Sequence, residues 1–441
     1  MMPVVLALAL SAPLTLDEVR AASRENLDAV RAEIALGRAE ENTRTARAAV
    51  LPQVALTSQI GMSASGQQRF FTTVPNGSGG FDQAAVDVPG NTRANFNFGV
   101  QLTQLLFDGG RWWNELARTG AARDAAQGQL AEQRLASELE AQRRFFELLR
   151  AQAVQQVLQS SVERSQAQLE RTQGFYEAGR VQKRDAIDAE VNLDADRISL
   201  LRQGPQIAQA RAALLGWLAR KPTEPVEAVD PGVLTLPLAA GPHVEEAQAL
   251  AEKQRPLWKA LDDQERAFSL AVATSRAAYL PRVSAQAGYL RQAATADPFF
   301  TDPTKQNTLQ LGLALQWDLF SGFATDAQVA RARLDLDENH RQREQALRDL
   351  SGDLQTAVTT LDAQLEIAKL ADSSCTLAES ALSLAVERFK AGAGSTLEVR
   401  DSQLKLTQAQ LQRLQSRIDL AIARAVVDRL TGATNAPGAS R

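Results

Sequence analysis

The stretch Ala-Arg-Ala-Ala-Val-Leu-Pro-Gln-Val at residues 46–54 decides the fold. It recurs in the second half of the chain as Ser-Arg-Ala-Ala-Tyr-Leu-Pro-Arg-Val at residues 275–283. A second phrase follows each copy, Leu-Phe-Asp-Gly-Gly at residues 106–110 and Leu-Phe-Ser-Gly-Phe at residues 319–323. Matching phrases in the same order indicate an internal duplication, which has to be recognised before a fold is assigned.

A third phrase shows how the chain divides. Tyr-Glu-Ala-Gly at residues 176–179 recurs as Phe-Lys-Ala-Gly at residues 389–392, with the same offset that relates the two copies of the second phrase. The long segment between the second and third phrases therefore has one length in both halves. The chain begins with an apolar stretch that ends in small residues, as secretory signals do, although no Lys or Arg precedes it and a buried N-terminal segment is the alternative. The expected organisation is a signal peptide at residues 1–12, a first repeat at 13–220, a linker at 221–242, a second repeat at 243–432 and a flexible tail at 433–441.

Within each repeat the hydrophobic pattern changes at the Leu-Pro phrase. Proline removes a backbone donor and biases the preceding residue toward extended geometry, so an Ala-rich helical segment gives way to a strand at Pro52 and at Pro281. Strands of about ten residues cross a bilayer when tilted, although the same alternation fits a soluble sheet with one wet face. The loops at residues 70–93 and 292–307 are long, as on the outer side of such barrels. Alternation predicts strands at about 53–65, 94–107, 282–291 and 308–320.

Long helices are expected after the strands, at about 109–178, 186–220, 322–391 and 396–431. At about 1.5 Å per residue, the longer helix of each repeat makes a rod of about 100 Å, which no compact domain of this size contains. Apolar residues in steps of three and four predict coiled-coil seams, and Gly204-Pro205 predicts a kink. The predicted seam residues are Ile187, Val191, Asp194, Ile198, Leu201, Leu354, Val358, Leu361, Leu365, Ala368, Cys375, Leu382, Val386, Phe389, Leu397, Leu404, Leu411, Ile418 and Ala425.

The composition excludes several classes of function. Among 441 residues there are two His and one Cys, and His243, His340 and Cys375 lie too far apart in sequence to suggest a shared metal site. The formal net charge of −4 provides no global positive field for nucleic acid. The chain is therefore not expected to be an enzyme, to hold a metal or a cofactor, or to bind nucleic acid.

Four strands are too few for one copy to form a pore. The smallest bilayer-spanning barrels have about eight strands, and an open sheet edge in lipid leaves unpaired backbone groups that cost several kcal/mol each. Copies of the chain must therefore share a barrel. The expected fold is an α+β membrane protein, in which three copies would give a 12-stranded β-barrel that continues into a barrel of long α-helices, with the polar strand faces lining the bore.

In this order, the duplicated phrases resemble the TolC-type outer-membrane efflux family, the outer membrane factors. The likeness extends from about residue 14 to residue 432. It implies a trimer surrounded by outer-membrane lipid, with helices extending into the periplasm, that docks onto a periplasmic adaptor (membrane fusion) protein joined to an inner-membrane pump. The residues that carry it are the strand–helix transitions at Pro52, Phe107, Gly109, Pro281, Phe320 and Gly322, the turns at Gly179 and Gly392, and Arg255, Pro256 and Leu257 before the second repeat.

The two helix turns are the expected adaptor-docking tip. Gly179 and Gly392 suit the left-handed position that ends a helix, and Ser395 with Glu398 three residues later predicts a capping box that starts the next one. The alternative is that these residues form tight turns between antiparallel helices and nothing more. The predicted docking residues are Gly179, Arg180, Val181, Gly392, Ala393 and Gly394.

Beyond the turns, the resemblance places a periplasmic aperture at Arg184, Asp185, Glu398 and Asp401. Three copies would bring like charges together, which favours cation capture or a pH-sensitive opening. The alternative is an ordinary solvated helix face. The gating arginine of well-known family members falls at Gly394, so their lock cannot be copied, and an Arg184–Glu398 ion pair is a candidate replacement.

These expectations describe a passive exit duct for substrates that an inner-membrane pump expels across the bacterial outer membrane. One alternative is the outer channel of one-step (type I) protein secretion. A less favoured alternative from another class is a soluble periplasmic coiled-coil scaffold with one face of its sheet in water.

Overall fold

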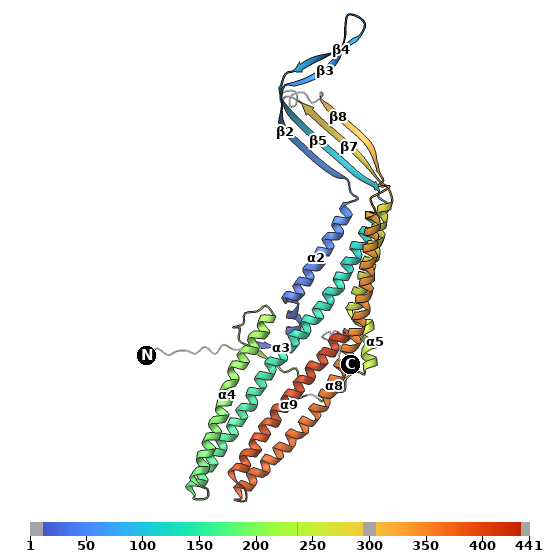
Figure 1. The fold of residues 1–441 in the computed structure, drawn as a ribbon. Helices are drawn as coiled ribbons and strands as arrows, with labels where there is room; N and C mark the ends of the chain where they lie inside the picture. Colours follow the sequence, from blue (N-terminus) through green and yellow to red (C-terminus); the bar gives the residue numbers. More distant parts are fainter. Residues whose placement is uncertain (1–11, 236, 294–305, 434–441) are drawn as a thin grey trace, which may run out of the picture. The chain divides into compact units, whose positions relative to one another are not determined.

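The structure is a computed structural model that describes residues 12–235, 237–293 and 306–433 (Figure 1). Most of the predicted signal peptide and of the predicted tail lies outside the described residues. The chain forms two compact units, each of which draws on both repeats. The first, here called the sheet unit, comprises residues 39–122 and 265–339. The second, the hairpin unit, comprises the described parts of residues 1–38, 123–264 and 340–441.

The sheet unit contains a four-stranded antiparallel sheet. Its strands, in spatial order, are β2 (Gln53–Ser65), β5 (Asn91–Phe107), β7 (Arg282–Ala293) and β8 (Asn307–Gln316). The registers set Leu56 opposite Val100, Val100 opposite Tyr289, and Tyr289 opposite Leu309. Because side chains alternate between faces, these pairs define an apolar face, and Gln310 lies on the other. This is the strand facing that the alternation predicts.

A further hairpin lies in a segment expected to be a loop. β3 (Gln68–Pro75) pairs with β4 (Phe81–Val88), and the pair of Gln68 with Val88 keeps the register that ends at Ser65 with Asn91 between β2 and β5. Most of the loop expected over residues 70–93 is therefore a β-hairpin, because residues on both sides of an Asn-Gly-containing turn extend the ladder. The other predicted loop, at residues 292–307, lies mostly outside the described residues.

Two helices of equal length dominate the repeats. α3 (Arg111–Glu177) and α8 (Ala324–Lys390) each contain 67 residues, and each is followed by a shorter helix, α4 (Lys183–Trp217) or α9 (Thr396–Thr431). Pro205 lies inside α4, which continues past it. Among the described residues, none of the helices combines the length and the apolar character needed to cross a membrane. The remaining elements are β1 (Ala12–Leu14), α1 (Leu16–Ala22), η1 (Ser23–Glu25), α2 (Leu27–Ala48), β6 (Val226–Ala228), α5 (Val244–Gln254), α6 (Pro256–Arg276) and η2 (Ala277–Tyr279).

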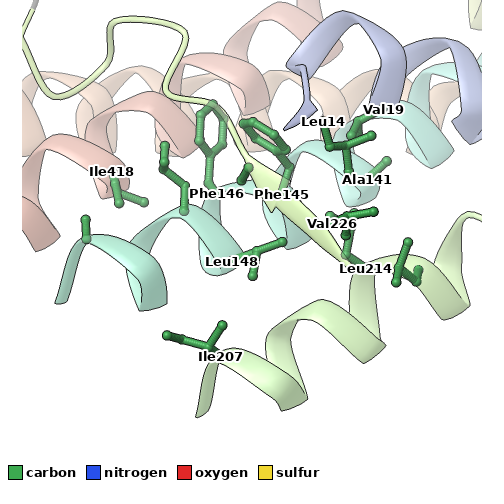
Figure 2. Close-up of a cluster of buried hydrophobic side chains, with 14 of the residues drawn as sticks. Leu14, Val19, Ala141, Phe145, Phe146, Leu148, Ile207, Leu214, Val226 and Ile418 are labelled. Atoms are coloured by element: carbon green, nitrogen blue, oxygen red, sulfur yellow. The ribbon is translucent and has the colours of Figure 1, made fainter. Parts of the chain in front are cut away.

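The largest apolar cluster of the hairpin unit joins α3, α4 and α9 to the small parallel sheet of β1 and β6 (Figure 2). Phe145 and Phe146 of α3 meet edge to face with ring centroids 5.7 Å apart. Leu148, Leu214 and Ile418 are fully buried around them. Each side chain of this size stabilises the fold by about 1.5–3 kcal/mol when buried. The cluster therefore fixes the N-terminal strand and the linker strand against helices of both repeats.

The helix seams agree with the predicted pattern on α8 but not on α4. Ile187 and Val191, predicted to be buried on α4, are 50% and 62% exposed, whereas Ala189 and Leu193 on another face are buried. Leu397 and Leu404 of α9 are also exposed, whereas Ile418 and Ala425 are buried as predicted. Both faces of α4 carry apolar residues, and periodicity alone does not say which of them packs within one chain. The predicted α8 seam residues that are buried are Leu354, Val358, Leu361, Leu365, Ala368, Cys375, Leu382 and Phe389.

Candidate functional site

The first strand–helix corner brings the two repeats together within the sheet unit. Gly109 has a φ of +71°, and a Cβ added to it would lie 2.7 Å from the Cβ of Leu280 and 2.8 Å from the carbonyl oxygen of Ala277. Glycine is therefore required here for both its backbone angle and its size. The backbone N–H of Trp112 donates to Asp108 Oδ2 at 3.0 Å, which caps the start of α3.

The other predicted corner residues also stand at strand ends. Pro52 and Pro281 immediately precede β2 and β7, and Phe107 ends β5 after a register irregularity. Phe320 and Gly322 lie between β8 and α8, where Gly322 has a φ of +62°. In both repeats the proline marks the change from helix to strand, and the Phe–Gly segment marks the change from strand to helix.

The two helix turns share one geometry. After α3, the N–H of Gly179 donates to the carbonyl of Tyr176 at 2.9 Å, and the N–H of Arg180 donates to the carbonyl of Phe175 at 2.8 Å. After α8, Gly392 and Ala393 make the equivalent bonds at 3.0 and 2.9 Å. With φ of +67° at Gly179 and +78° at Gly392, both are Schellman motifs, in which glycine takes the left-handed position.

Side chains connect the two turns. The rings of Phe175 and Phe389 lie 5.4 Å apart, and Val181 packs on the apolar cluster that contains Phe389. The Arg180 guanidinium lies over the ring of Phe175 at 4.6 Å and would come within 3.8 Å of a Cβ at Gly392. The structure therefore brings the predicted docking residues of both repeats into one surface at the ends of the helices.

Gly394 differs from the other turn glycines. A Cβ at this position would lie 3.0 Å from the backbone nitrogen of Phe389 and 3.3 Å from the carbonyl carbon of Arg388. The backbone is thus too close for a side chain without some displacement.

The predicted ion pair between Arg184 and Glu398 is not formed within the chain. Arg184 instead lies 3.6 Å from Asp188, and Glu398 lies 3.4 Å from Arg388. Each partner lies in the same helix pair as the residue it contacts, either α3 with α4 or α8 with α9. These short-range partners, here within one of the two helical hairpins, outcompete a contact between the hairpins. Asp401 likewise pairs with Lys405 at 2.7 Å. Glu398 and Asp401, the two carboxylates of α9 predicted to line the aperture, are therefore each accompanied by a basic side chain.

The start of α9 is capped by half of the predicted capping box. The N–H of Glu398 donates to Ser395 Oγ at 3.2 Å, but the Glu398 carboxylate pairs with Arg388 instead of returning to the cap. Asp185 makes the reciprocal kind of contact on α4, where it accepts from the N–H of Gln182 at 3.0 Å. Its other oxygen accepts from the hydroxyl of Thr396 at 3.1 Å, so Asp185 joins the two hairpins.

A buried polar contact farther from the turns was not predicted. Arg400 of α9 donates to both carboxylate oxygens of Asp196 of α4, at 2.8 and 3.0 Å, and Ser165 of α3 donates to the same carboxylate. Burial alone would raise the pKa of Asp196, but the bonds from Arg400 and Ser165 outweigh it and hold the pKa below its usual value. Sequence gives no signal for this pair, because the partners are 204 residues apart.

A groove of about 250 Å³ lies beside this contact between α3, α4 and α9. It is lined by Gln168, Asp185, Val191, Leu397 and Gln403 among others. Among the described residues, there is no cluster of His, Cys, Asp and Glu side chains able to hold a metal ion. Cys375 is buried, and burial together with the charge of Glu379 raises the pKa of its thiol, as suits an inert packing residue.

Solved structures of outer-membrane channels share this fold. CusC matches with a TM-score of 0.76 at 16% identity, covering 95% of this chain and 92% of CusC. VceC from Vibrio cholerae matches with a TM-score of 0.72 at 17% identity, covering 95% and 96%. MtrE of Neisseria gonorrhoeae, in its open state, matches with a TM-score of 0.72 at 17% identity, covering 95% and 88%. A comparison with curated proteins finds no match.

The sequence model of the family described as outer membrane efflux protein matches residues 19–220 and 248–433. These two segments make up most of the chain, and the break between them falls at the linker between the repeats. The chain therefore belongs to the outer membrane efflux protein family, whose members are channels and not enzymes.

Proposed function

We propose that this protein is the outer-membrane channel of a tripartite efflux system, a passive duct for substrates expelled by an inner-membrane pump. The observation that carries the proposal is the open sheet with one exposed apolar face. Leu309, Leu311 and Leu313 of β8 are 70%, 76% and 74% exposed, and within the described residues β2 and β8 each have a strand neighbour on one side only. Such a sheet is stable in lipid only when further copies pair with its edges.

Association into a trimer is supported by exposed apolar rows on two helices. On α4 the row is Ile187, Val191, Ile198 and Leu201, and on α8 it is Leu370, Leu377 and Leu384. Each row starts within about two helical turns of its hairpin turn and extends for about four turns. Their heptad spacing suits knobs-into-holes packing. In a ring of copies, the α4 row of one chain would lie antiparallel on the α8 row of the next.

Cysteine crosslinking of the purified channel tests this assembly. With the buried Cys375 replaced by alanine, Leu201→Cys and Leu370→Cys, which lie level along the two rows, should together form disulfides between chains in detergent, giving bands of two and three copies on a denaturing gel. The two single-cysteine variants are the controls. A detergent-extracted particle with the mass of one chain, with no crosslinked bands, would contradict the trimer.

Docking of a periplasmic adaptor at the turns is a separate part of the proposal. It is supported by the exposure of Gly179, Arg180, Gly392 and Ala393 and by the small size of three of them, since small residues let a partner helix approach closely. Ala393→Trp should abolish efflux of a dye such as ethidium in cells that carry adaptor and pump, while trimer assembly stays normal. Unchanged efflux would remove these turns from the docking surface.

Two other functions give different outcomes. For one-step protein secretion, loss of the chain should stop export of a protein and leave ethidium efflux unchanged. For a soluble periplasmic scaffold, the chain should leave the membrane fraction on carbonate washing, whereas the duct should require detergent. The exposed leucine row of β8 favours the duct, because a water-soluble sheet would cover it.

A further inference from the structure

The strand–helix corner of the second repeat carries two exposed phenylalanines. The rings of Phe320 and Phe323 meet edge to face, with centroids 5.5 Å apart and an interplanar angle of 87°. They are 75% and 72% exposed. Phe323 has a φ of +64°, in the left-handed region that costs a bulky residue about a tenfold shift in the folding equilibrium. A strained backbone that displays an apolar side chain to solvent needs an explanation.

The first repeat shows that the turn itself does not require phenylalanine. The corresponding position there is Gly110, which follows Gly109 as Phe323 follows Gly322, and it has a φ of +82°. Glycine adopts this angle without strain. The same two-residue left-handed corner is therefore available without a side chain. The exposed ring of Phe323 has to contribute something that packing inside the chain does not provide.

The phenylalanine pair continues the exposed apolar row of β8. Leu315 is 68% exposed, and Leu319, beyond the end of the strand, is 78% exposed. Polar groups flank the pair. The exposed Asp318 precedes it, the hydroxyl of Ser321 between the two rings lies 3.1 Å from that of Thr325, and Asp326 accepts from the Tyr279 hydroxyl at 2.5 Å. Apolar surface thus changes to polar surface within one helical turn, as at the boundary of a bilayer.

We propose that Phe320 and Phe323 form an interfacial anchor that inserts among the headgroups and upper acyl chains of phospholipid, in the periplasmic leaflet of the outer membrane. The inference rests on the proposed function, which places the β8 row in the hydrocarbon and the helices in the periplasm. Aromatic rings are favoured at this depth. Contact with lipid offsets the strain at residue 323, and it holds the corner at a fixed depth.

Spin labels on the full-length channel in phosphatidylethanolamine–phosphatidylglycerol vesicles test the depth. In the Cys375→Ala background, single labels are placed at Phe323, at Leu313 in the middle of the apolar row, and at the exposed Asp337 on α8. We expect oxygen accessibility to dominate at 313, a water-soluble nickel complex to dominate at 337, and intermediate values at 323. An aqueous label at 323 with a lipid-exposed label at 313 overturns the anchor and leaves the channel intact. Aqueous labels at both positions overturn the channel as well.

A pair of substitutions tests the energetic role. Phe323→Gly copies the first repeat, so it should keep the corner and leave thermal stability in detergent equal or higher. Phe320→Ala with Phe323→Gly should lower the fraction assembled in vesicles by about fivefold, since both rings would lose their proposed contact with lipid. Phe81→Ala, which removes an equally exposed ring from the β4 end of the sheet unit, is the matched control. Wild-type assembly of the double variant in vesicles would overturn the anchor.

Discussion

Asp196 and Arg400 hold the two hairpins together through a contact that is almost closed to water, with side chains 11% and 14% exposed. Removing one partner of a buried pair leaves the other charge uncompensated, at a cost of about 3 kcal/mol. Asp196→Asn should therefore lower the free energy of unfolding of the helices by about that amount, as measured by denaturant titration with circular dichroism. Glu366→Gln, which removes the exposed partner of Lys369, should cost less than about 1 kcal/mol.

The same pair predicts a pH dependence. The pKa of Asp196 is lower in the folded protein than in the unfolded chain, where it is near 3.9. The ionised carboxylate therefore contributes its full stabilisation of the fold above the unfolded-state pKa. This stabilisation is lost as the pH falls through the folded-state pKa. The wild-type protein and Asp196→Asn should differ fully in stability at about pH 6 and converge below about pH 4. A difference that persists at low pH would show that the hydrogen-bonded carboxylate does not carry the effect.

Two glycines near the end of α3 should respond with opposite signs. Gly179 has a φ of +67°, whereas Gly174 lies inside the helix, and an added Cβ would meet nothing within 4 Å at either position. Gly179→Ala should destabilise the hairpin by about 1 kcal/mol through strain, and Gly174→Ala should stabilise it by up to about 1 kcal/mol. Thermal melts of the two variants check this. Equal effects would mean that the turn relaxes out of the left-handed conformation.

At the scale of elements, β8 provides a matched pair of positions on its two faces. Leu313 lies on the apolar face opposite Ala285, and Gln310 lies on the polar face opposite Gly288. Leu313→Arg should block assembly in the outer membrane, because a charge on the lipid face costs about 2–4 kcal/mol at mid-bilayer, and Gln310→Arg should assemble normally. Heat-modifiability on gels of membrane fractions measures assembly. Normal assembly of both variants would contradict the facing of the sheet.

The elements differ in how far sequence predicts them. The strands could be predicted because apolar and polar residues alternate along each of them, and the α8 seam because apolar residues recur in steps of three and four over many turns, as the buried Leu354, Val358 and Leu361 do. The seam of α4 could not, because Leu193 and Ile198 are apolar residues on different faces and only tertiary packing selects the first. In the candidate site, the two glycine turns follow from local sequence. The pairing of Asp196 with Arg400 depends on the rotation of two helices that local sequence does not specify.

For the whole molecule, the equal 67-residue lengths of α3 and α8 bring the two glycine turns to one end, where they meet through Phe175 and Phe389. A symmetric assembly would repeat this surface around its axis. The side chains beside the turns would then act as rings and not as single groups. Glu398 and Asp401 are the acidic members of such rings, and Arg388 and Lys405 are their nearest basic partners.

Neutralising the acidic rings tests whether they line the conducting path. Glu398→Gln together with Asp401→Asn leaves Arg388 and Lys405 without carboxylate partners, so the aperture of a trimer would become basic. In planar bilayers, the reversal potential in a KCl gradient should shift toward anion selectivity, and block by divalent cations should weaken. Both effects should shrink between 0.1 M and 1 M salt, because the screening length falls from about 10 Å to about 3 Å.

Glu366→Gln, far from the turns on α8, is the control and should change neither the reversal potential nor the divalent block. If the double variant keeps the wild-type selectivity and divalent block at 0.1 M salt, these carboxylates form a solvated outer face and the aperture is built from other residues.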